Sequence, residues 1–142
     1  MKMSEFKDNV VIITGASSGI GRELAWLLAS EGAWLSLAAR NKARLDDVAA
    51  KCRELGGKAL VVQTDVGDEG QCRRLIDATV AEYGRIDTLV NNAGYGLNGR
   101  LADLPDLKEF RTLMDVDFYG CVCCTYYALG YIKRSRGRIV GI

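Results

Sequence analysis

Short apolar runs alternate with longer stretches of helical periodicity along this chain. The apolar runs predict five strands, at 9–14, 33–39, 58–65, 86–94 and 137–142. Between them the helical stretches lie at 20–30, 41–57, 69–84 and about 106–135, and the last is expected to break near its start. The first run, NVVIIT, has no polar alternation, which is typical of a strand covered on both faces. This order of strands and helices predicts a parallel sheet with helices on both of its faces.

The ends of the predicted helices carry recognisable signals. Helical spacing in the stretch 20–30 places three leucines, Leu24, Leu27 and Leu28, on one face. Asn41 stands where the second helix begins and is a suitable N-cap, because its side chain can accept a hydrogen bond from the first turn. Gly84 closes the third helix, where a left-handed residue is common.

The segment TGASSGIG, residues 14–21, joins the first strand to the first helix and contains Gly15, Gly19 and Gly21. In such a sheet, ligands bind beyond the carboxyl ends of the strands. A helix that starts near Ser18 or Gly19 would present unpaired N–H groups and the positive end of its dipole there. Side chains at these glycines would restrict the turn, phosphate approach or helix–strand packing. The loop therefore predicts a pyrophosphate site, with a purely structural loop as the alternative.

The spacing of these glycines differs from the standard G-x-G-x-x-G fingerprint, and no Lys-Ser/Thr pair follows them as in a P-loop.

The formal net charge is +1, which argues against a partner that is a nucleic acid or a membrane surface. No apolar run approaches the ~20 residues that span a bilayer. The beginning of the chain, MKMSEFKDN, lacks the apolar segment of a secretory signal. These features predict a single domain over residues 1–142 of a cytoplasmic protein.

The five cysteines are an odd number without the spacing of a disulfide framework. Cys121 and Cys124 form a C-x-x-C pair, which raises a redox or metal-binding role as one interpretation. The pair lies in an apolar, helix-like run, and the chain has no histidine to complete a mixed metal site. Buried structural thiols are therefore the favoured interpretation, and no metal site is expected.

The segment TGASSGIG at 14–21, together with NNAG at 91–94, resembles the short-chain dehydrogenase/reductase family over nearly the whole chain. The fold expected is an α/β doubly wound, Rossmann-type parallel sheet with strand order 3-2-1-4-5. The family fold continues with further strands and helices, so the chain is expected to stop after the fifth strand of that fold. The resemblance implies an oxidoreductase that interconverts a hydroxyl and a carbonyl on a small-molecule substrate.

The resemblance also implies roles for individual residues of this chain. The residues expected to line the pyrophosphate and adjoining ribose are Gly15, Ser17, Ser18, Gly19, Ile20 and Gly21. Those expected to flank the adenine are Asp65 and Val66, and those bordering the nicotinamide-side ribose are Asn92, Ala93 and Gly94, with Asn91 helping to fix the central sheet. The alternative for Asp65, Asn91 and Asn92 is that they are turn residues that satisfy backbone groups, and both interpretations can hold together.

The segment AARNKAR bears on the choice of cofactor. An acidic residue at the end of the second strand would favour NAD, whereas an arginine nearby accommodates the 2′-phosphate of NADP. Ala39 stands where the acid is expected, Arg40 and Asn41 follow, and Lys42 and Arg44 are close by. Arg40 suits a phosphate because its guanidinium offers paired donors. NADP is therefore predicted in preference to NAD, with a solvated Arg40 and a merely capping Asn41 as the alternative.

The family transfers its proton through a serine and a Y-x-x-x-K pair, and the resemblance places all three beyond residue 142. No tyrosine of this sequence is followed four positions later by a lysine, so the chain alone is predicted to be inactive. A non-catalytic NADP-binding or partner module is the rival from another class. A flavin- or sugar-nucleotide-using relative on the same fold is a third.

In MDVDFYG, at 114–120, Asp117 stands where the family has an asparagine of the proton relay. Asp117 is therefore a candidate catalytic residue, and a helix-distorting polar residue is the alternative.

The helix at about 108–134 is apolar on more than one face. Because one face must meet the sheet, the other predicts a homo-oligomer.

Overall fold

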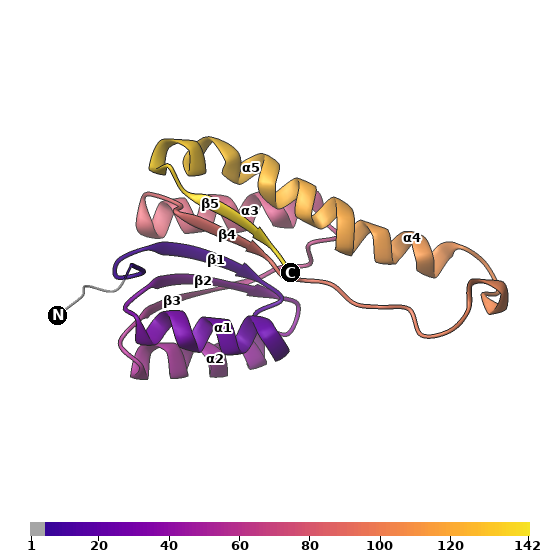
Figure 1. The fold of residues 1–142 in the computed structure, drawn as a ribbon, viewed down its shortest axis with the longest axis horizontal. Coiled ribbons are helices and arrows are strands. Elements are labelled where there is room, and N and C mark those ends of the chain that lie inside the picture. The colour runs from indigo at the N-terminus through magenta and orange to yellow at the C-terminus, as the bar shows by residue number, and fades with distance from the viewer. Residues whose placement is uncertain (1–4) are drawn as a thin grey trace.

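The computed structural model describes residues 5–142, and its five strands form one parallel sheet in the order β3-β2-β1-β4-β5 (Figure 1). The strands are β1 (Val10–Thr14), β2 (Trp34–Ala39), β3 (Lys58–Gln63), β4 (Thr88–Asn91) and β5 (Arg138–Gly141). The main helices are α1 (Gly19–Ser30), α2 (Lys42–Glu54), α3 (Glu69–Tyr83), α4 (Lys108–Met114) and α5 (Gly120–Ser135). The predicted doubly wound topology and strand order are confirmed.

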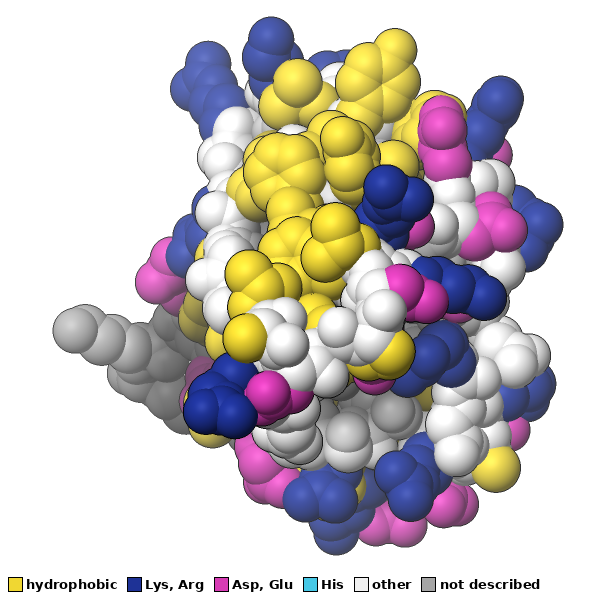
Figure 2. Space-filling view, turned by 90° about the vertical axis from the view of Figure 1, so that its right-hand side faces the viewer, with side chains coloured by type: hydrophobic (Ala, Val, Ile, Leu, Met, Phe, Trp, Pro, Cys, Tyr) yellow, Lys and Arg dark blue, Asp and Glu magenta, His cyan; other side chains and the backbone are white. Residues whose placement is uncertain are grey.

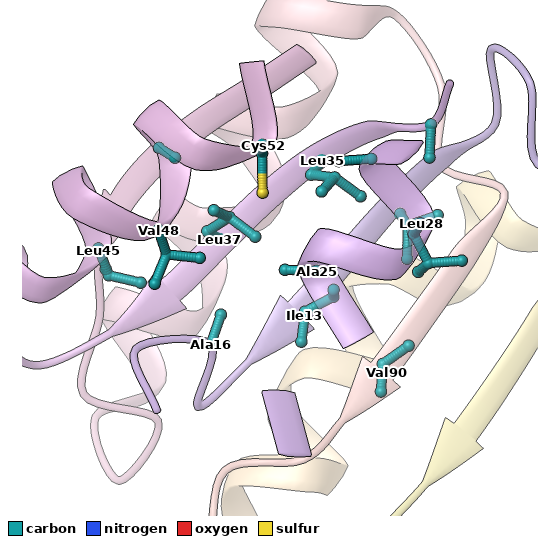
Figure 3. Packing of buried hydrophobic residues seen from close by; sticks show 14 of the residues in the cluster. Ile13, Ala16, Ala25, Leu28, Leu35, Leu37, Leu45, Val48, Cys52 and Val90 are labelled. Atoms are coloured by element: carbon teal, nitrogen blue, oxygen red, sulfur yellow. The ribbon is translucent and has the colours of Figure 1, made fainter. Parts of the chain in front are cut away.

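The two faces of the sheet are covered by different helices. Helices α1 and α2 pack on one face, and α3 and α5 pack on the other (Figure 1). The side chains of β1 alternate between the two cores, since Ile13 packs under α1 and α2 while Ile12 packs under α3 and α5. Figure 3 shows Ile13 in the first core, together with Leu35 and Leu37 of β2. This double cover explains why β1 has no polar alternation.

The prediction that three leucines of α1 share one face is wrong for Leu27. Leu28 is buried and Leu24 is partly buried against the first core, whereas Leu27 is 61% exposed. The helix contacts the sheet through a stripe that includes Gly21 and Ala25. Because successive residues turn by about 100°, Leu27 lies beside this stripe rather than on it.

The predicted helix ends are confirmed. Helix α1 begins at Gly19 with Ser18 as its N-cap. The Asn41 side chain caps α2 by accepting a hydrogen bond from the backbone N–H of Arg44 at 3.0 Å. Gly84 ends α3 in the left-handed conformation, with φ of 75°.

The long C-terminal helical stretch is not broken near its start as expected, because its backbone stays helical from Lys108 to Ser135, and only the hydrogen-bond pattern changes part-way along. A π-helical segment, Asp115–Tyr119, separates α4 from α5 and contains Asp117. Before α4, the chain runs through an extended loop with a short 3-10 turn at Leu101–Asp103, at the right of Figure 1. Within residues 5–142, no helix is both long and apolar enough to cross a bilayer.

Candidate functional site

A cleft of ≈ 1080 Å³ lies beyond the carboxyl ends of the strands, at the end of the molecule that faces the viewer in Figure 2. It is lined by Gly15, Ser17, Ser18, Gly19, Ile20, Ala39, Arg40, Asn41, Arg44, Thr64, Asp65, Val66, Asn92, Ala93, Gly94, Tyr95, Val116, Asp117, Cys121 and Ile142. Every site residue predicted from the sequence is in this set except Gly21. The loops after β1, β2, β3 and β4 therefore meet at one place, as parallel strands require.

The three glycines of the loop after β1 serve different purposes. Gly19 has φ of +54°, and a Cβ there would meet no atom within 4 Å, so its backbone is open to the cleft. A Cβ at Gly15 would lie 2.9 Å from the Ala93 Cα, and one at Gly21 would lie 2.5 Å from the Asn92 Nδ2. Gly15 and Gly21 therefore allow close packing against the segment after β4, and Gly21 lies behind the loop rather than in the cleft.

The N-terminus of α1 points its backbone donors at the cleft without a side-chain partner. The N-cap Ser18 makes no capping hydrogen bond with its side chain, and the first turn of α1 contains no acidic residue. The first N–H groups of a helix have no partner inside the helix, and together with the helix dipole they attract an anion. This end of α1 therefore fits a phosphate group.

The loop after β2 brings positive charge to the cleft. Arg40 and Arg44 line it, and neither side chain forms an ion pair with any of residues 5–142. Lys42, the other nearby cation, forms an ion pair with Asp46 at 2.7 Å and does not line the cleft. Asn41 lines the cleft and also caps α2.

The segment after β4 is held against the glycine loop by hydrogen bonds. Asn92 Nδ2 donates to the backbone oxygen of Thr14 at 2.9 Å and to that of Gly15 at 3.2 Å. The backbone N–H groups of Asn92 and Ala93 both donate to Thr14 Oγ1 at 3.0 Å. The sequence reasoning missed Thr14, and the signal available was a hydroxyl at the end of an otherwise apolar strand.

The neighbouring Asn91 is buried and points away from this loop. Its Nδ2 donates to Thr125 Oγ1 at 3.2 Å, which ties β4 to α5. This contact fits the expectation that Asn91 fixes the central sheet. Asp65 accepts a hydrogen bond from the backbone N–H of Gly67 at 2.9 Å, so it acts as a turn residue while it lines the cleft.

Asp117 joins the π-helical segment to the loop after β4. Its Oδ1 accepts a hydrogen bond from the backbone N–H of Tyr95 at 3.1 Å. A Cβ at Gly94 would lie 3.2 Å from the same oxygen, so the glycine allows the carboxylate to approach the backbone. Sequence reasoning did not identify Tyr95 as a cleft residue, because only the tertiary fold brings it beside Asp117.

The two cysteines of the C-x-x-C pair have different surroundings. Cys121 lines the cleft, and its Sγ donates to the backbone oxygen of Asp117 at 3.2 Å. Cys124 is buried in the core between α3 and α5, where a hydrogen bond with Cys72 and burial raise the pKa of the Cys124 thiol. Residues 5–142 contain no group of three or more His, Cys, Asp or Glu side chains that could hold a metal ion.

A doubly wound parallel sheet with an uncapped helix terminus at its switch point is the architecture of a Rossmann-type nucleotide-binding fold. The model of one family, short chain dehydrogenase, matches residues 9–142. This chain belongs to the short-chain dehydrogenase family, whose members are oxidoreductases that use nicotinamide cofactors.

The chain is similar to curated plant proteins over most of its own length. It is 46% identical over 132 residues to 11-beta-hydroxysteroid dehydrogenase A of Sesamum indicum. The aligned region covers 92% of this chain and 38% of that protein. It is 45% identical over 134 residues to 11-beta-hydroxysteroid dehydrogenase 1A of Arabidopsis thaliana, and the aligned region covers 94% of this chain and 38% of that protein. The chain thus spans 38% of the length of these relatives.

Solved structures share the fold at lower sequence identity. An alcohol dehydrogenase from Thermococcus sibiricus, complexed with 5-hydroxy-NADP, superposes with a TM-score of 0.90 at 31% identity, over 94% of this chain and 57% of that one. The NADH-dependent reductase A1-R′, complexed with NAD, superposes with a TM-score of 0.88 at 30% identity. This superposition covers 99% of this chain and 61% of that one. Both nicotinamide cofactors therefore occur among proteins with this fold.

Proposed function

We propose that this chain binds NADP and serves an oxidoreductase reaction that interconverts a hydroxyl and a carbonyl on a small molecule. The observation that carries the choice of NADP is Arg40 at the cleft end of β2, which forms no ion pair within residues 5–142, together with Arg44, which also lines the cleft. A 2′-phosphate needs cationic donors at this place, and a guanidinium offers them in pairs. The names of the plant relatives make a hydroxysteroid the first substrate class to test.

Each part of the cofactor has a matching part of the cleft. The open backbone at Gly19 and the uncapped donors of α1 suit the pyrophosphate. Ala39, in place of an acid, leaves no carboxylate at the end of β2 to repel a 2′-phosphate. The proposed adenine contacts are Asp65 and Val66, and the proposed contacts at the nicotinamide-side ribose are Asn92, Ala93 and Gly94.

When bound, the nicotinamide cofactor supplies the hydride chemistry. The residues of this chain would bind it, orient it and hold the segment after β4 against the glycine loop. Asp117 is the proposed member of the proton path, since it lines the cleft next to Gly94. No tyrosine among the 142 residues has a lysine four positions later, so binding without turnover is expected of this polypeptide.

The same observation favours a second candidate function, a module that binds NADP without catalysis. The two candidates make different predictions for a chimaera in which this chain replaces the matching part of a longer relative. The oxidoreductase should oxidise a hydroxysteroid or a simple alcohol there, and the module should oxidise neither. Grafting residues 9–142 in place of the matching segment of the Sesamum indicum relative, and assaying NADP reduction, separates them. Activity of the chimaera supports the oxidoreductase, and a chimaera that folds and binds NADP without turnover supports the module.

The choice of cofactor is tested by the substitution Arg40→Asp. It removes a cation from the 2′-phosphate and places a carboxylate there, which repels the phosphate and can accept hydrogen bonds from ribose hydroxyls. Loss of one charge-assisted contact should cost ~1.5–3 kcal/mol, or about one to two decades in NADP affinity. Dissociation constants for NADP and NAD should be measured side by side, and the difference should shrink with added salt.

Lys42→Asp is the matched control, because it makes the same charge change two positions away and outside the cleft. It should leave the ratio of the two dissociation constants nearly unchanged. If the unsubstituted chain binds NADP and NAD equally and Arg40→Asp changes neither constant, Arg40 is only a solvated surface residue and the proposed cofactor is wrong.

A further inference from the structure

The charges at the two sides of the cleft are opposite. Strands β2 and β4 lie on either side of β1 in the sheet, so their loops flank the glycine loop from opposite sides. The loop after β2 contributes the cations Arg40 and Arg44. On the β4 side, the charged side chain lining the cleft is that of Asp117. The loop after β3, the strand next to β2, adds the carboxylate of Asp65, so two cations and one anion line the cleft on that side. A ligand that spans the cleft therefore meets net positive charge at one end and negative charge at the other.

The charge of Asp117 has no cationic partner among residues 5–142. One carboxylate oxygen, Oδ1, accepts the hydrogen bond from the Tyr95 N–H, and no other described group donates to the side chain. It forms no ion pair within the described part of the chain. Gly94, the neighbouring residue, has no side chain to stand between the carboxylate and the cleft. An unneutralised carboxylate at this position favours a cation on the ligand.

A nicotinamide dinucleotide carries such a cation in only one oxidation state. The oxidised nicotinamide ring has a formal charge of +1, and the reduced dihydronicotinamide ring is neutral. With the 2′-phosphate at Arg40 and the pyrophosphate at the start of α1, the nicotinamide half extends to the β4 side, where Asp117 lies. This placement rests on the proposed function, because it takes NADP as the ligand.

We propose that Asp117 makes the cleft discriminate between the two oxidation states of the cofactor, strengthening the binding of NADP⁺ relative to NADPH. The family's asparagine would have nearly the same shape without the charge, so this selectivity is a property of the aspartate in this chain. Two unit charges several ångströms apart in a medium of intermediate dielectric interact strongly enough to change an affinity about three- to tenfold.

Asp117→Asn is the sharpest test, because the amide oxygen of asparagine can still accept the Tyr95 hydrogen bond while the charge is lost. Dissociation constants for NADP⁺ and NADPH should be measured by calorimetry with the unsubstituted chain and with the variant. We expect the preference for NADP⁺ over NADPH to fall about three- to tenfold in Asp117→Asn. An unchanged ratio of the two constants would overturn the proposal.

Asp115→Asn is the matched control, since Asp115 is exposed, lies two residues away and does not line the cleft. It removes the same charge and should leave the ratio unchanged. An equal fall of the ratio in both variants would assign the effect to net charge and overturn the role of Asp117. A measurement on the unsubstituted chain does not depend on how the variants fold. Because salt screens the charge of Asp117, the preference for NADP⁺ over NADPH should fall between low and high salt. A preference that is insensitive to salt contradicts the proposal.

Adenosine 2′,5′-bisphosphate, which has the 2′-phosphate and no nicotinamide, separates this inference from the proposed function. It should bind the unsubstituted chain and Asp117→Asn equally and should lose affinity in Arg40→Asp. If it does not bind the unsubstituted chain, the proposed NADP site fails. If it binds as expected while the NADP⁺ to NADPH ratio is the same in both proteins, only the role of Asp117 fails.

Discussion

Thr14 and Asn92 are joined by two hydrogen bonds at the base of the cleft, both donated by Asn92 and accepted by Thr14. The backbone N–H of Asn92 donates to Thr14 Oγ1 at 3.0 Å, and Asn92 Nδ2 donates to the Thr14 backbone oxygen at 2.9 Å. Ala93 adds a second backbone donor to the same hydroxyl. One threonine side chain therefore fixes two loops from strands that lie side by side, β1 and β4.

Thr14→Val should destabilise the fold, because the valine has the same shape and leaves the N–H groups of Asn92 and Ala93 without their acceptor. Each partly buried donor left unsatisfied costs about 1–3 kcal/mol, so a loss of about 2–6 kcal/mol is expected for the two donors. Urea unfolding followed by circular dichroism measures it. Thr112→Val, at an exposed position on α4, is the control and should change the unfolding free energy by less than about 0.5 kcal/mol. Equal midpoints for the two variants would contradict this role of Thr14.

Gly21→Ala should destabilise the protein even without a ligand. The new Cβ would lie 2.5 Å from Asn92 Nδ2 and 2.6 Å from the Gly15 oxygen, so the loops have to separate, at a cost of about 1–3 kcal/mol. Gly130→Ala is the control: this glycine is exposed in the interior of α5 with nothing near its Cβ position, and alanine should stabilise the helix by about 0.5–1 kcal/mol. Thermal unfolding should therefore shift in opposite directions for the two variants.

Gly19→Ala should separate binding from folding. Its Cβ meets no protein atom, so the cost to stability is the strain of a positive φ, about 1–2 kcal/mol. The methyl group would instead occupy the space in front of the helix terminus. The expected result is a loss of NADP affinity larger than the loss produced by Gly130→Ala, measured by titration at a temperature where both variants are folded. An unchanged affinity would show that the phosphate lies elsewhere.

The caps of α2 and α3 should respond differently to acid. The backbone N–H of Gln71 donates to the Asp68 carboxylate and holds the pKa of Asp68 below its usual value. A lowered pKa in the folded state means that this contribution to stability is present above about pH 4 and is lost as the pH falls through the folded pKa. The difference in unfolding free energy between the unsubstituted chain and Asp68→Asn should therefore shrink between pH 5 and pH 2.5.

Asn41 provides the comparison, because its amide does not titrate. Asn41→Ala should cost about 1 kcal/mol at every pH in this range, through the loss of the cap on Arg44 N. Guanidinium unfolding at several pH values measures both effects. A pH-dependent loss for Asn41→Ala would mean that the acid response has another source.

Self-association is expected through α5 and the segment before it. The exposed apolar residues Phe118, Val122, Tyr126 and Leu129 recur at helical spacing on this surface, and Figure 2 shows hydrophobic side chains gathered at the end where α4 lies. Tyr126→Lys should therefore shift the chain toward a monomer in sedimentation. Leu27→Lys, a similarly exposed apolar position on α1, should leave the association unchanged. A monomeric unsubstituted chain would rule out this interface.

The strands and the glycine loop could be predicted from local patterns of the sequence, and the strand order was implied by the family resemblance that TGASSGIG and NNAG carry. The face of α1 was partly mispredicted, since Gly21 and Ala25 contact the sheet and small residues give a weak apolar signal. The role of Thr14 and the contact between Asp117 and Tyr95 depend on segments far apart in the chain. No local pattern specifies which side chain completes a hydrogen bond across such a distance.

The central position of β1 has a consequence during synthesis. Its five residues are wholly apolar or β-branched and are buried on both sides once the sheet is complete. In the folded protein the backbone N–H of Val10 donates a hydrogen bond to the carboxylate of Asp87, which is 77 positions further along the chain. At typical translation speeds of about 5–20 residues per second, the ribosome needs ~4–15 s to supply that partner. During this interval the side of the first strand that will pair with β4 is an unpaired edge, and we expect a nascent-chain chaperone to bind there.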